Sequence, residues 1–407
     1  MPSTRTSIAR TVLIACLLSG SAALGATNGS RQQDNTSAPE ALFYYEFTGA
    51  NADEVSIPAG LVSDKLIMVY QHKFGVYPFI GRDGAVFNGG VPQRTKMAEH
   101  LREVARDINE EIPDPDFDGY VVIDYEGWRP FWDNTSDKYK NMSRELVRQK
   151  HPDWDDARIE RKARTGYEAA AKKLLSRTLD KCHAMRPKAK WGIFGYPRAN
   201  MRDNSARWLW NRQDAFFPEI YMQYSLAPDG VTPQLGEEPE ARYIRDRLVA
   251  RVGFARELAG DRPVLPVIWP RYQKSNPNPD LRYQPVKQSD LVVALEGPLS
   301  RGADGVVIWE NIPMPELATD FQAQIDDSIA PELERILTDR GLPTDGTRES
   351  ATSDPAAGGD ADRRSGGGKS GKNSKKNKKG KNGKNGKNGK KGNKGKSGND
   401  RRSRGGG

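Results

Sequence analysis

Two carboxylates stand one residue apart in the stretch VVIDYEGWRP, residues 121–130. Asp124 and Glu126 follow three aliphatic residues, a pattern that predicts a buried β-strand ending at this point. On a strand, residues i and i+2 point to the same side, about 6–7 Å apart. The charge of one carboxylate raises the pKa of the other, so that one can keep its proton while the other stays charged. This pairing is typical of general acid–base chemistry such as the cleavage of a glycosidic bond.

The same two acids are compatible with a less specific role. A solvated pair at a strand end, or a salt bridge with Arg129, needs the same residue types at the same spacing. Other chemistries lack their motifs, because the sequence has no phosphate loop, no dinucleotide fingerprint, no Gly-x-Ser-x-Gly and no His-Glu-x-x-His. We expect neither a metal site nor a cofactor, since the histidines are scattered along the chain at His72, His100, His151 and His183.

Seven short apolar runs, rich in aromatic and β-branched residues, indicate strands that are buried on both faces of a parallel sheet. They cover residues 41–47, 65–71, 119–126, 191–197, 219–225, 263–269 and 305–310. Helical patterns lie between most of them, over residues 94–110, 155–185, 240–259 and 288–301. This alternation predicts an α/β fold of the TIM-like barrel kind. A doubly wound open sheet is the alternative, although the Gly-rich phosphate turn expected of it is absent.

Aromatic and polar side chains stand at the ends of several predicted strands. They are Tyr70, Gln71, Tyr196, Tyr221, Tyr224, Trp269, Trp309 and Glu310. In a barrel the C-terminal ends of the strands form the face that carries the active site. Flat apolar rings stack on the C–H faces of sugars, so the set as a whole predicts a sugar-binding cleft that includes Trp269. For any single ring, packing at the barrel end is the alternative.

The N-terminal end of the chain predicts export. Arg5 and Arg10 precede the apolar run TVLIACLLSGSAAL, which is typical of a secretory signal peptide over residues 1–26, with a linker over residues 27–40. The run is too short to be a permanent membrane span. The letters LIAC resemble a bacterial lipobox, so a lipid anchor at Cys16 is the alternative to cleavage near the end of the signal. We therefore expect a protein that is secreted or held at the cell surface.

The predicted catalytic domain covers residues 41–340. Cys182 is the only cysteine after the signal, so this domain has no internal disulfide even though export would permit one. Cys182 lies inside the helical pattern over residues 155–185, which favours a buried structural thiol over a nucleophile.

The C-terminal tail, residues 341–407, is of low complexity and rich in Lys, Gly and Asn. Residues 360–407 hold 18 Lys and Arg against 3 Asp and Glu, while the whole chain carries a net charge of only +9, so the rest of the chain is acidic. We expect this tail to be disordered. A flexible polycation attracts polyanions through counterion release, and a solvated tail without a target is the alternative. An association with nucleic acid is a further hypothesis, against which export and the acidic domain count.

The stretch VVIDYEGWRP resembles the core motif of the hyaluronidase family, glycoside hydrolase family 56, whose members carry Asp-x-Glu-x-Trp-Arg-Pro. Other stretches resemble further segments of that family in the same order along the chain. They are FNGGVPQ (87–93), RQKHPDWDDARIERKA (148–163), RPKAKWGIFGYP (186–197), FFPEIYM (216–222), VLPVIWPRYQ (264–273) and GADGVVIWEN (302–311). The resemblance covers residues 66–312, and it is specific because several motifs occur at matching spacing.

The resemblance implies a distorted barrel of seven β/α units. It also implies endo-hydrolysis, with retention, of β-linked N-acetylhexosamine bonds in hyaluronan or chondroitin, with the substrate's own acetamido oxygen as the nucleophile. Glu126 would then be the acid and base, and Asp124 would orient the acetamido nitrogen. Tyr221 would help to position the acetamido group, and Trp309 would form a wall of its pocket. Arg247 falls near the position of a substrate-binding arginine; a surface arginine on a helix is the alternative.

The chain departs from the family pattern at Phe194, where the family usually has a tyrosine. Phe194 has no hydroxyl to bond the acetamido group, and we expect Tyr196, two residues on and on the same side of the strand, to replace it. The cysteines that brace animal members are absent, as is their cysteine-rich extension. A non-catalytic polysaccharide-binding protein, a lectin or adhesin on the same barrel, is therefore the alternative. The intact Asp124 and Glu126 favour the enzyme.

Overall fold

Parallel strands that alternate with helices form the centre of the domain. The structure, a computed structural model, describes residues 41–198, 201, 204–226 and 238–344, so the predicted signal, the linker and all but the first residues of the tail lie outside it. One sheet has the strand order β3-β6-β7 and another the order β2-β1-β9-β8. The strands are β1 (Phe43–Thr48), β2 (Leu61–Val62), β3 (Leu66–Tyr70), β6 (Tyr120–Asp124), β7 (Lys190–Ile193), β8 (Val267–Ile268) and β9 (Val306–Asn311).

Single β-bridges join the two sheets at the position of the fifth predicted strand. Phe217 pairs with Phe194 on one side, while Phe216 and Glu219 pair with residues of the β8 segment on the other. The strand predicted over residues 219–225 is therefore wrong in its bounds, since the pairing residues lie at 216–219. Pro218 lies among them and has no N–H group, so a continuous hydrogen-bonded ladder cannot form there.

The interior of the barrel is a hydrophobic cluster that receives at least one side chain from each of the seven strand positions. Its members include Tyr44, Met68, Val122, Phe194, Phe217, Val267 and Val307. Their neighbours along the strands, such as Phe43 and Val121, point outward into a second cluster beneath the helices. The strands are thus buried on both faces, which is why they appear in the sequence as apolar runs without alternation. Together with the parallel order, this confirms the predicted α/β barrel.

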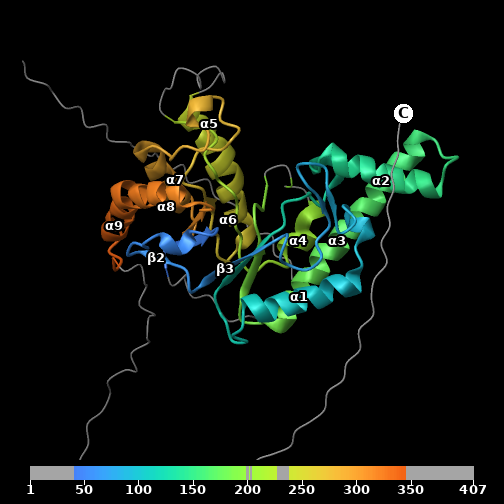
Figure 1. The fold of residues 1–407 in the computed structure, drawn as a ribbon, viewed down its shortest axis with the longest axis horizontal. Helices are drawn as coiled ribbons and strands as arrows, with labels where there is room; N and C mark the ends of the chain where they lie inside the picture. The colour runs from blue at the N-terminus through green and yellow to red at the C-terminus, as the bar shows by residue number, and fades with distance from the viewer. Residues whose placement is uncertain (1–40, 199–200, 202–203, 227–237, 345–407) are drawn as a thin grey trace, which may run out of the picture. The chain divides into compact units, whose positions relative to one another are not determined.

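Helices cover the outside of the barrel, and the four predicted ones are confirmed. They are α1 (Met97–Glu111), α3 (Asp156–Met185), the continuous run of α5 (Pro239–Tyr243), a π-helix (Ile244–Gly253) and α6 (Phe254–Ala259), and α7 (Gln288–Ser300). The prediction did not include α2 (Asp137–Lys150), α4 (Arg207–Trp210), α8 (Pro315–Gln324), a π-helix (Ile325–Ile329) or α9 (Ala330–Asp339). In Figure 1, α3 lies alongside α1 and α2, and it packs against both.

Short elements connect these parts. Strands β4 (Phe79–Ile80) and β5 (Val86–Phe87) form an antiparallel hairpin after β3. Turns of 3₁₀-helix occur at η1 (Ala52–Glu54), η2 (Pro92–Arg94), η3 (Trp132–Asn134), η5 (Asn204–Ala206) and η8 (Pro279–Leu281).

The long helix α3 begins and packs as its sequence dictates. The carboxylate of Asp155 accepts the backbone N–H of Arg158 at 2.8 Å, which satisfies one of the unpaired donors of the first turn. A stripe of buried residues about one turn apart, including Ile159, Tyr167 and Cys182, faces the barrel. Cys182 is free and fully buried, as predicted, and burial raises the pKa of its thiol well above the ordinary value.

Candidate active site

Asp124 and Glu126 lie at the C-terminal end of the barrel. Strand β6 ends at Asp124, so Glu126 stands in the loop that follows and not on the strand as predicted. The two acids are nevertheless close enough for the charge of Glu126 to act on Asp124. The predicted pair of interacting carboxyl groups is therefore present, although the loop and not the pleat of a strand positions its second member.

Both carboxyl groups have raised pKa values. Burial raises the pKa of Asp124 well above its ordinary value, Glu126 adds to the shift and Arg129 opposes it. Glu126 is exposed at the surface, yet desolvation by the surrounding protein atoms raises its pKa. The positive charge of Arg129 is the main effect that lowers this pKa, and desolvation outweighs it. The pair holds a proton at a pH where an isolated carboxyl group would have lost it. In addition, Oδ1 of Asp124 is buried and has no hydrogen-bond partner among the described residues.

Gln71 holds the loop that carries Glu126. The side-chain oxygen Oε1 of Gln71 accepts the backbone N–H of Glu126 at 3.2 Å and that of Gly127 at 2.9 Å. The backbone N–H of Gln71 in turn donates to the carbonyl of Asp124 at 3.0 Å. Gln71 therefore ties the end of β3 to the backbone on both sides of the acid pair. The sequence marked Gln71 only as a polar residue at a strand end.

An aromatic stack packs the other side of this loop. The ring of Tyr77 lies between those of Tyr125 and Trp128, with centroid distances of 4.1 and 5.1 Å and interplanar angles of 25° and 17°. A Cβ at Gly127 would lie 2.7 Å from Cβ of Phe79, so only glycine fits at this position. The loop is thus fixed by close packing as well as by hydrogen bonds.

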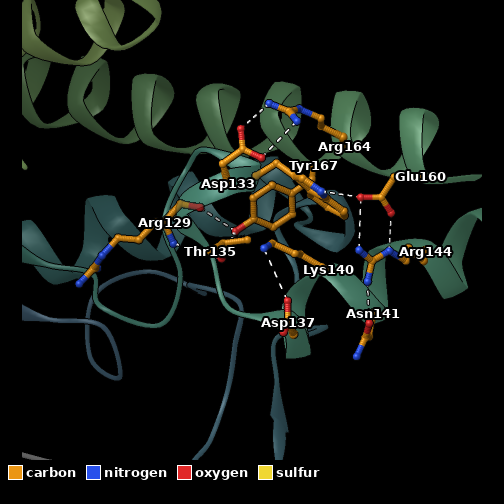
Figure 2. A network of polar contacts seen from close by, with 11 residues as sticks. Arg129, Asp133, Thr135, Asp137, Lys140, Asn141, Arg144, Glu160, Arg164 and Tyr167 are labelled. Atoms are coloured by element: carbon orange, nitrogen blue, oxygen red, sulfur yellow. Dashed lines mark hydrogen bonds and ion pairs between the residues drawn. The ribbon is translucent and has the colours of Figure 1, made fainter. Parts of the chain in front are cut away.

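A polar network anchors the next part of the chain to α2 and α3 (Figure 2). The hydroxyl of Tyr167 on α3 donates to the carbonyl of Arg129 at 2.8 Å and lies 3.0 Å from Oγ1 of Thr135. The indole N–H of Trp132 donates to Glu160 at 2.8 Å, and Glu160 also pairs with an arginine of α2. Figure 2 shows that the guanidinium of Arg129 points away from this network. Its backbone is held on α3 while its charge stays close to the acid pair.

Four of the predicted substrate-binding residues form an aromatic wall. The ring of Tyr221 lies 6.1 Å from that of Trp309 at an angle of 16°, and about the same distance from Phe194 and Trp269, at 6.0 Å each. Burial raises the pKa of the Tyr221 hydroxyl well above its ordinary value, and the charges of Glu126, Glu219 and Asp124 add to the shift. The wall and the acid pair therefore belong to one site.

Two further carboxylates, the buried Glu310 and the half-buried Glu46, are linked to the wall by hydrogen bonds. The indole N–H of Trp269 donates to Glu310 at 2.8 Å, and that of Trp309 donates to the hydroxyl of Tyr70 at 3.0 Å. Tyr70 in turn donates to Glu46 across the seam between β3 and β1, at 3.3 Å. Glu46, Tyr70 and Trp309 also line a cavity of about 440 Å³ that opens beside the wall. Burial raises the pKa of Glu46 to about 7, although the bond from Tyr70 lowers it.

Tyr196 does not occupy the place that the sequence predicted. Strand β7 ends at Ile193, and Gly195 adopts a positive φ of 75°, which breaks the alternation between residues 194 and 196. Phe194 therefore faces the barrel interior, while Tyr196 lies fully buried in the outer cluster. The guanidinium of Arg129 lies 5.6 Å from the centre of the Tyr196 ring. The expectation that both residues point to the same side of the strand is wrong.

Arg247 is buried, with 8% of its surface exposed, so the alternative of a surface arginine is wrong. It belongs to a cationic group around Glu219 that the sequence did not reveal. Glu219 pairs with Arg251 at 3.0 Å and with Arg198 at 3.6 Å. Burial raises the pKa of Glu219, but Arg251, Arg247 and Arg198 outweigh it and hold the pKa below the ordinary value. These cations outnumber the acid that they surround.

In the part of the chain that the structure describes, no three His, Cys, Asp or Glu side chains are grouped so that they could hold a metal ion. Within the same residues, no helix combines the length and apolarity that a membrane crossing requires.

Comparison with known proteins places the chain in a family. The family model described as hyaluronidase, glycoside hydrolase family 56, matches residues 54–205 and 198–339. Hyaluronidase-1 of Homo sapiens is 30% identical over 292 residues, which are 65% of this chain and 63% of that protein, so the match spans less than two thirds of this relative. The hyaluronidase of Apis mellifera is 30% identical over 289 residues, 64% of this chain and 72% of that protein.

Solved structures agree with the sequence comparison. The crystal structure of bee venom hyaluronidase superposes with a TM-score of 0.58 at 25% identity, covering 72% of this chain and 99% of that one. The structure of that enzyme in complex with a hyaluronic acid tetramer gives a TM-score of 0.55 at 26% identity, with the same coverage. The barrel, the motifs and the family match all agree: this chain is a member of the hyaluronidase family, glycoside hydrolase family 56.

Proposed function

We propose that this protein is an exported endo-glycosidase that hydrolyses β-linked N-acetylhexosamine bonds in hyaluronan- or chondroitin-like glycosaminoglycans. The observation that carries the proposal is the pair of neighbouring carboxyl groups of Asp124 and Glu126, both with raised pKa values, beside an aromatic wall. Paired carboxyl groups with raised pKa values suit acid–base cleavage of a glycosidic bond, and stacked rings suit a sugar. The bee venom relative was solved with a hyaluronic acid tetramer, which supports this class of substrate.

Glu126 acts as the acid and then as the base. Its raised pKa keeps a proton available, and its exposure lets a substrate approach. As the bond between C1 and the glycosidic oxygen breaks, the electron pair goes to that oxygen, which takes the proton of Glu126. In the second step the carboxylate of Glu126 removes a proton from the water that attacks C1.

The nucleophile of the first step is the carbonyl oxygen of the substrate's acetamido group. A lone pair of this oxygen forms a bond to C1, which gives an oxazolinium intermediate, and water later displaces it so that the configuration at C1 is retained. Asp124 orients the group by accepting its N–H, and it stabilises the positive charge that develops when the proton shared by the pair resides on Glu126. The buried oxygen Oδ1 of Asp124, without a partner among the described residues, supports this role. A buried acceptor of this kind is costly unless a ligand fills it.

The wall of Tyr221, Trp309 and Trp269 binds the sugar that carries the acetamido group. The wall is near the acid pair, because the charges of both Glu126 and Asp124 raise the pKa of the Tyr221 hydroxyl. Arg247 supplies positive charge for a uronate carboxylate, and Arg198 and Arg251 contribute to the same field around Glu219. Charge-assisted contacts of arginine with carboxylates are strong, so these cations favour an anionic polymer over a neutral one.

A non-catalytic lectin or adhesin is the second candidate function, because Phe194 supplies no hydroxyl to the pocket. The release of reducing ends from hyaluronan, chondroitin and chitin-type polymers distinguishes the two, with Glu126→Gln as the control. We expect release from the uronate polymers and a loss of about 10²–10⁴-fold in Glu126→Gln, the usual contribution of a general acid. Absence of release from every N-acetylated polymer would contradict the enzyme. Full activity in Glu126→Gln would contradict the role of Glu126.

Export and the basic tail complete the proposal. The signal over residues 1–26 directs the chain out of the cytoplasm, and the tail over residues 341–407 binds polyanions by its charge. Salt should therefore weaken retention of the full chain on immobilised hyaluronan much more than it weakens retention of a chain that ends at residue 344. Equal sensitivity of the two chains to salt would contradict a role for the tail.

A further inference from the structure

A second cavity lies between the η2 turn, α2 and α3, and none of the active-site residues described above lines it. Figure 1 shows α2 alongside α3, and η2 packs against α3. The cavity has a volume of about 210 Å³. Pockets for drug-sized ligands have about 300–1,000 Å³, so this one has room for a single sugar-sized group.

The inside of this cavity is partly apolar. Leu146 and Val147 of α2 and Ala163 of α3 form the apolar part. Gln93 of η2 also lines the cavity, and its side-chain oxygen Oε1 is buried without a hydrogen-bond partner among the described residues. Such an unpaired buried oxygen is costly and is satisfied when a ligand donates a hydrogen bond to it.

Positive charge surrounds the cavity. Arg94, Lys150 and Lys162 line it from three different elements, all three are exposed, and His151 lies beside them. No aspartate or glutamate is among the described residues that line the cavity. Elsewhere the exposed cations of α2 and α3 are often paired, as Arg148 is with an aspartate of α3 at 2.9 Å. The cavity therefore offers positive charge that the described residues do not neutralise.

We propose that this cavity binds one hexuronate residue of an anionic polysaccharide, at a site separate from the catalytic cleft. The C–H face of the ring would lie on Leu146 and Val147, a ring hydroxyl would donate to Gln93, and the carboxylate would meet Arg94, Lys150 and Lys162. An inorganic anion would contact only the three cations. A neutral sugar would contact only the apolar side chains and Gln93. The inference rests on the proposed function, because it takes a glycosaminoglycan as the ligand.

The test locates the bound sugar on the full-length chain carrying Glu126→Gln, which removes turnover. Hydrogen–deuterium exchange is compared with and without a hyaluronan hexasaccharide, at constant ionic strength. We expect protection in two places, in residues 121–130 of the cleft and in residues 89–95 and 143–166 around the cavity. A neutral chitin hexasaccharide should protect the cleft alone. Cleft protection by hyaluronan without any protection at the cavity would overturn the inference and leave the proposed function intact.

A charge-neutral variant of the cavity tests its residues directly. The triple change Arg94→Gln, Lys150→Gln and Lys162→Gln keeps the side-chain stems and removes the three charges. We expect the protection around the cavity to be lost and its affinity for the hexasaccharide to fall about tenfold, as for three modest ion pairs. Protection in the cleft should persist. Unchanged protection around the cavity in this variant would contradict the site.

A matched control uses three other exposed cations of α3 that do not line the cavity, changed as Arg161→Gln, Lys173→Gln and Arg177→Gln. Both variants lose the same charge and keep the basic tail, so any general attraction for the polymer changes equally. The control should keep the protection around the cavity, and its loss there would show a diffuse charge effect and contradict the site. A competition experiment gives a further check. If inorganic phosphate displaces the hexasaccharide from the cavity at the same concentration as free glucuronate does, the cavity is a site for simple anions, and the inference is contradicted.

Discussion

The side-chain oxygen of Gln71 accepts the backbone N–H groups of both Glu126 and Gly127, at 3.2 and 2.9 Å. A single acceptor thus fixes the two peptide units that flank the Cα of the proposed acid, Glu126. Because β6 ends at Asp124, the hydrogen bonds of the sheet no longer hold Glu126. Gln71 replaces them, and it directly follows β3, the strand that neighbours β6 in the same sheet. The position of the acid relative to a substrate depends on this contact.

We expect Gln71→Met, which keeps the length of the side chain and removes the acceptor, to lower kcat. A misplacement of a catalytic group by about 1 Å costs up to about 10²-fold in rate, and we expect a loss of about tenfold. KM should change little, because the aromatic wall is untouched. Steady-state kinetics on hyaluronan separates the two parameters. A change confined to KM would contradict a positioning role.

Gln322→Met is the matched control for this prediction. The Oε1 of Gln322 accepts the backbone N–H of Ser56 at 2.7 Å at the surface, far along the chain from the acid pair. This variant loses a hydrogen bond of the same kind, so it should lose similar stability and keep its kcat. Gln71→Glu is the complementary change, since it retains the acceptor and adds a charge that raises the pKa of its acidic neighbours. Its pH–rate profile should move to higher pH.

Glu46 should make the stability of the fold depend on pH. Its pKa is raised from 4.5 to about 7 in the folded protein, mainly by burial. Because the folded state binds the proton more tightly than the unfolded one, this stabilisation is complete below about pH 4.5 and is lost as the pH rises through about 7. The free energy of unfolding should fall by as much as about 3 kcal/mol over this range from this group alone.

Urea unfolding at several pH values, compared between the wild type and Glu46→Gln, measures this effect. The variant keeps an acceptor for Tyr70 and has no charge to bury, so the fall in stability between mildly acidic and mildly basic pH should be smaller. Glu54→Gln, at an exposed position, is the control and should behave as the wild type does. An identical pH dependence in the wild type and Glu46→Gln would show that Glu46 does not carry the shift.

The sequence predicted the barrel because its strands are buried on both faces, and such strands stand out as apolar runs. It failed where proline interrupts the ladder, as at Pro218, since the apolar run continues beyond the residues that pair. Helix α2 was missed for the opposite reason. Its apolar stripe of Tyr139, Met142, Leu146 and Val147 is narrow and lies among charged residues, and only Tyr139 and Ser143 of its 14 residues are buried, so the helical pattern is weak.

The acid pair and the aromatic wall could also be predicted from the sequence, because a family motif and a set of strand ends mark them. The contacts that support them could not be predicted. Gln71 and Glu126 are 55 residues apart, and their hydrogen bond depends on two strands being neighbours in the sheet. The pairing of Glu219 with Arg251 likewise depends on how a helix packs on the barrel. Local spacing carries no signal for such contacts.

Phe194→Tyr should raise activity. Phe194 faces the barrel interior, 6.0 Å from the ring of Tyr221, and a tyrosine there places a hydroxyl at the edge of the proposed acetamido pocket. A neutral hydrogen bond contributes about 0.5–1.5 kcal/mol, so kcat/KM should rise roughly threefold to tenfold. Kinetics on a hyaluronan oligosaccharide tests this, with thermal unfolding to check the fold. A fall in activity at unchanged stability would show that the pocket has no use for the hydroxyl.

Arg247→Gln should weaken the binding of uronate polymers selectively. Arg247 is buried in the cationic group around Glu219, and a charge-assisted bond to a carboxylate contributes about 1.5 kcal/mol, which is about tenfold in KM. The KM for hyaluronan should rise by this factor, while binding of a neutral chitin oligosaccharide should stay unchanged. Arg245→Gln, an exposed neighbour on the same π-helix, is the control for the loss of one charge. Equal losses of binding for the anionic and the neutral ligand would mean that Arg247 supports the fold of the site and does not bind the uronate carboxylate.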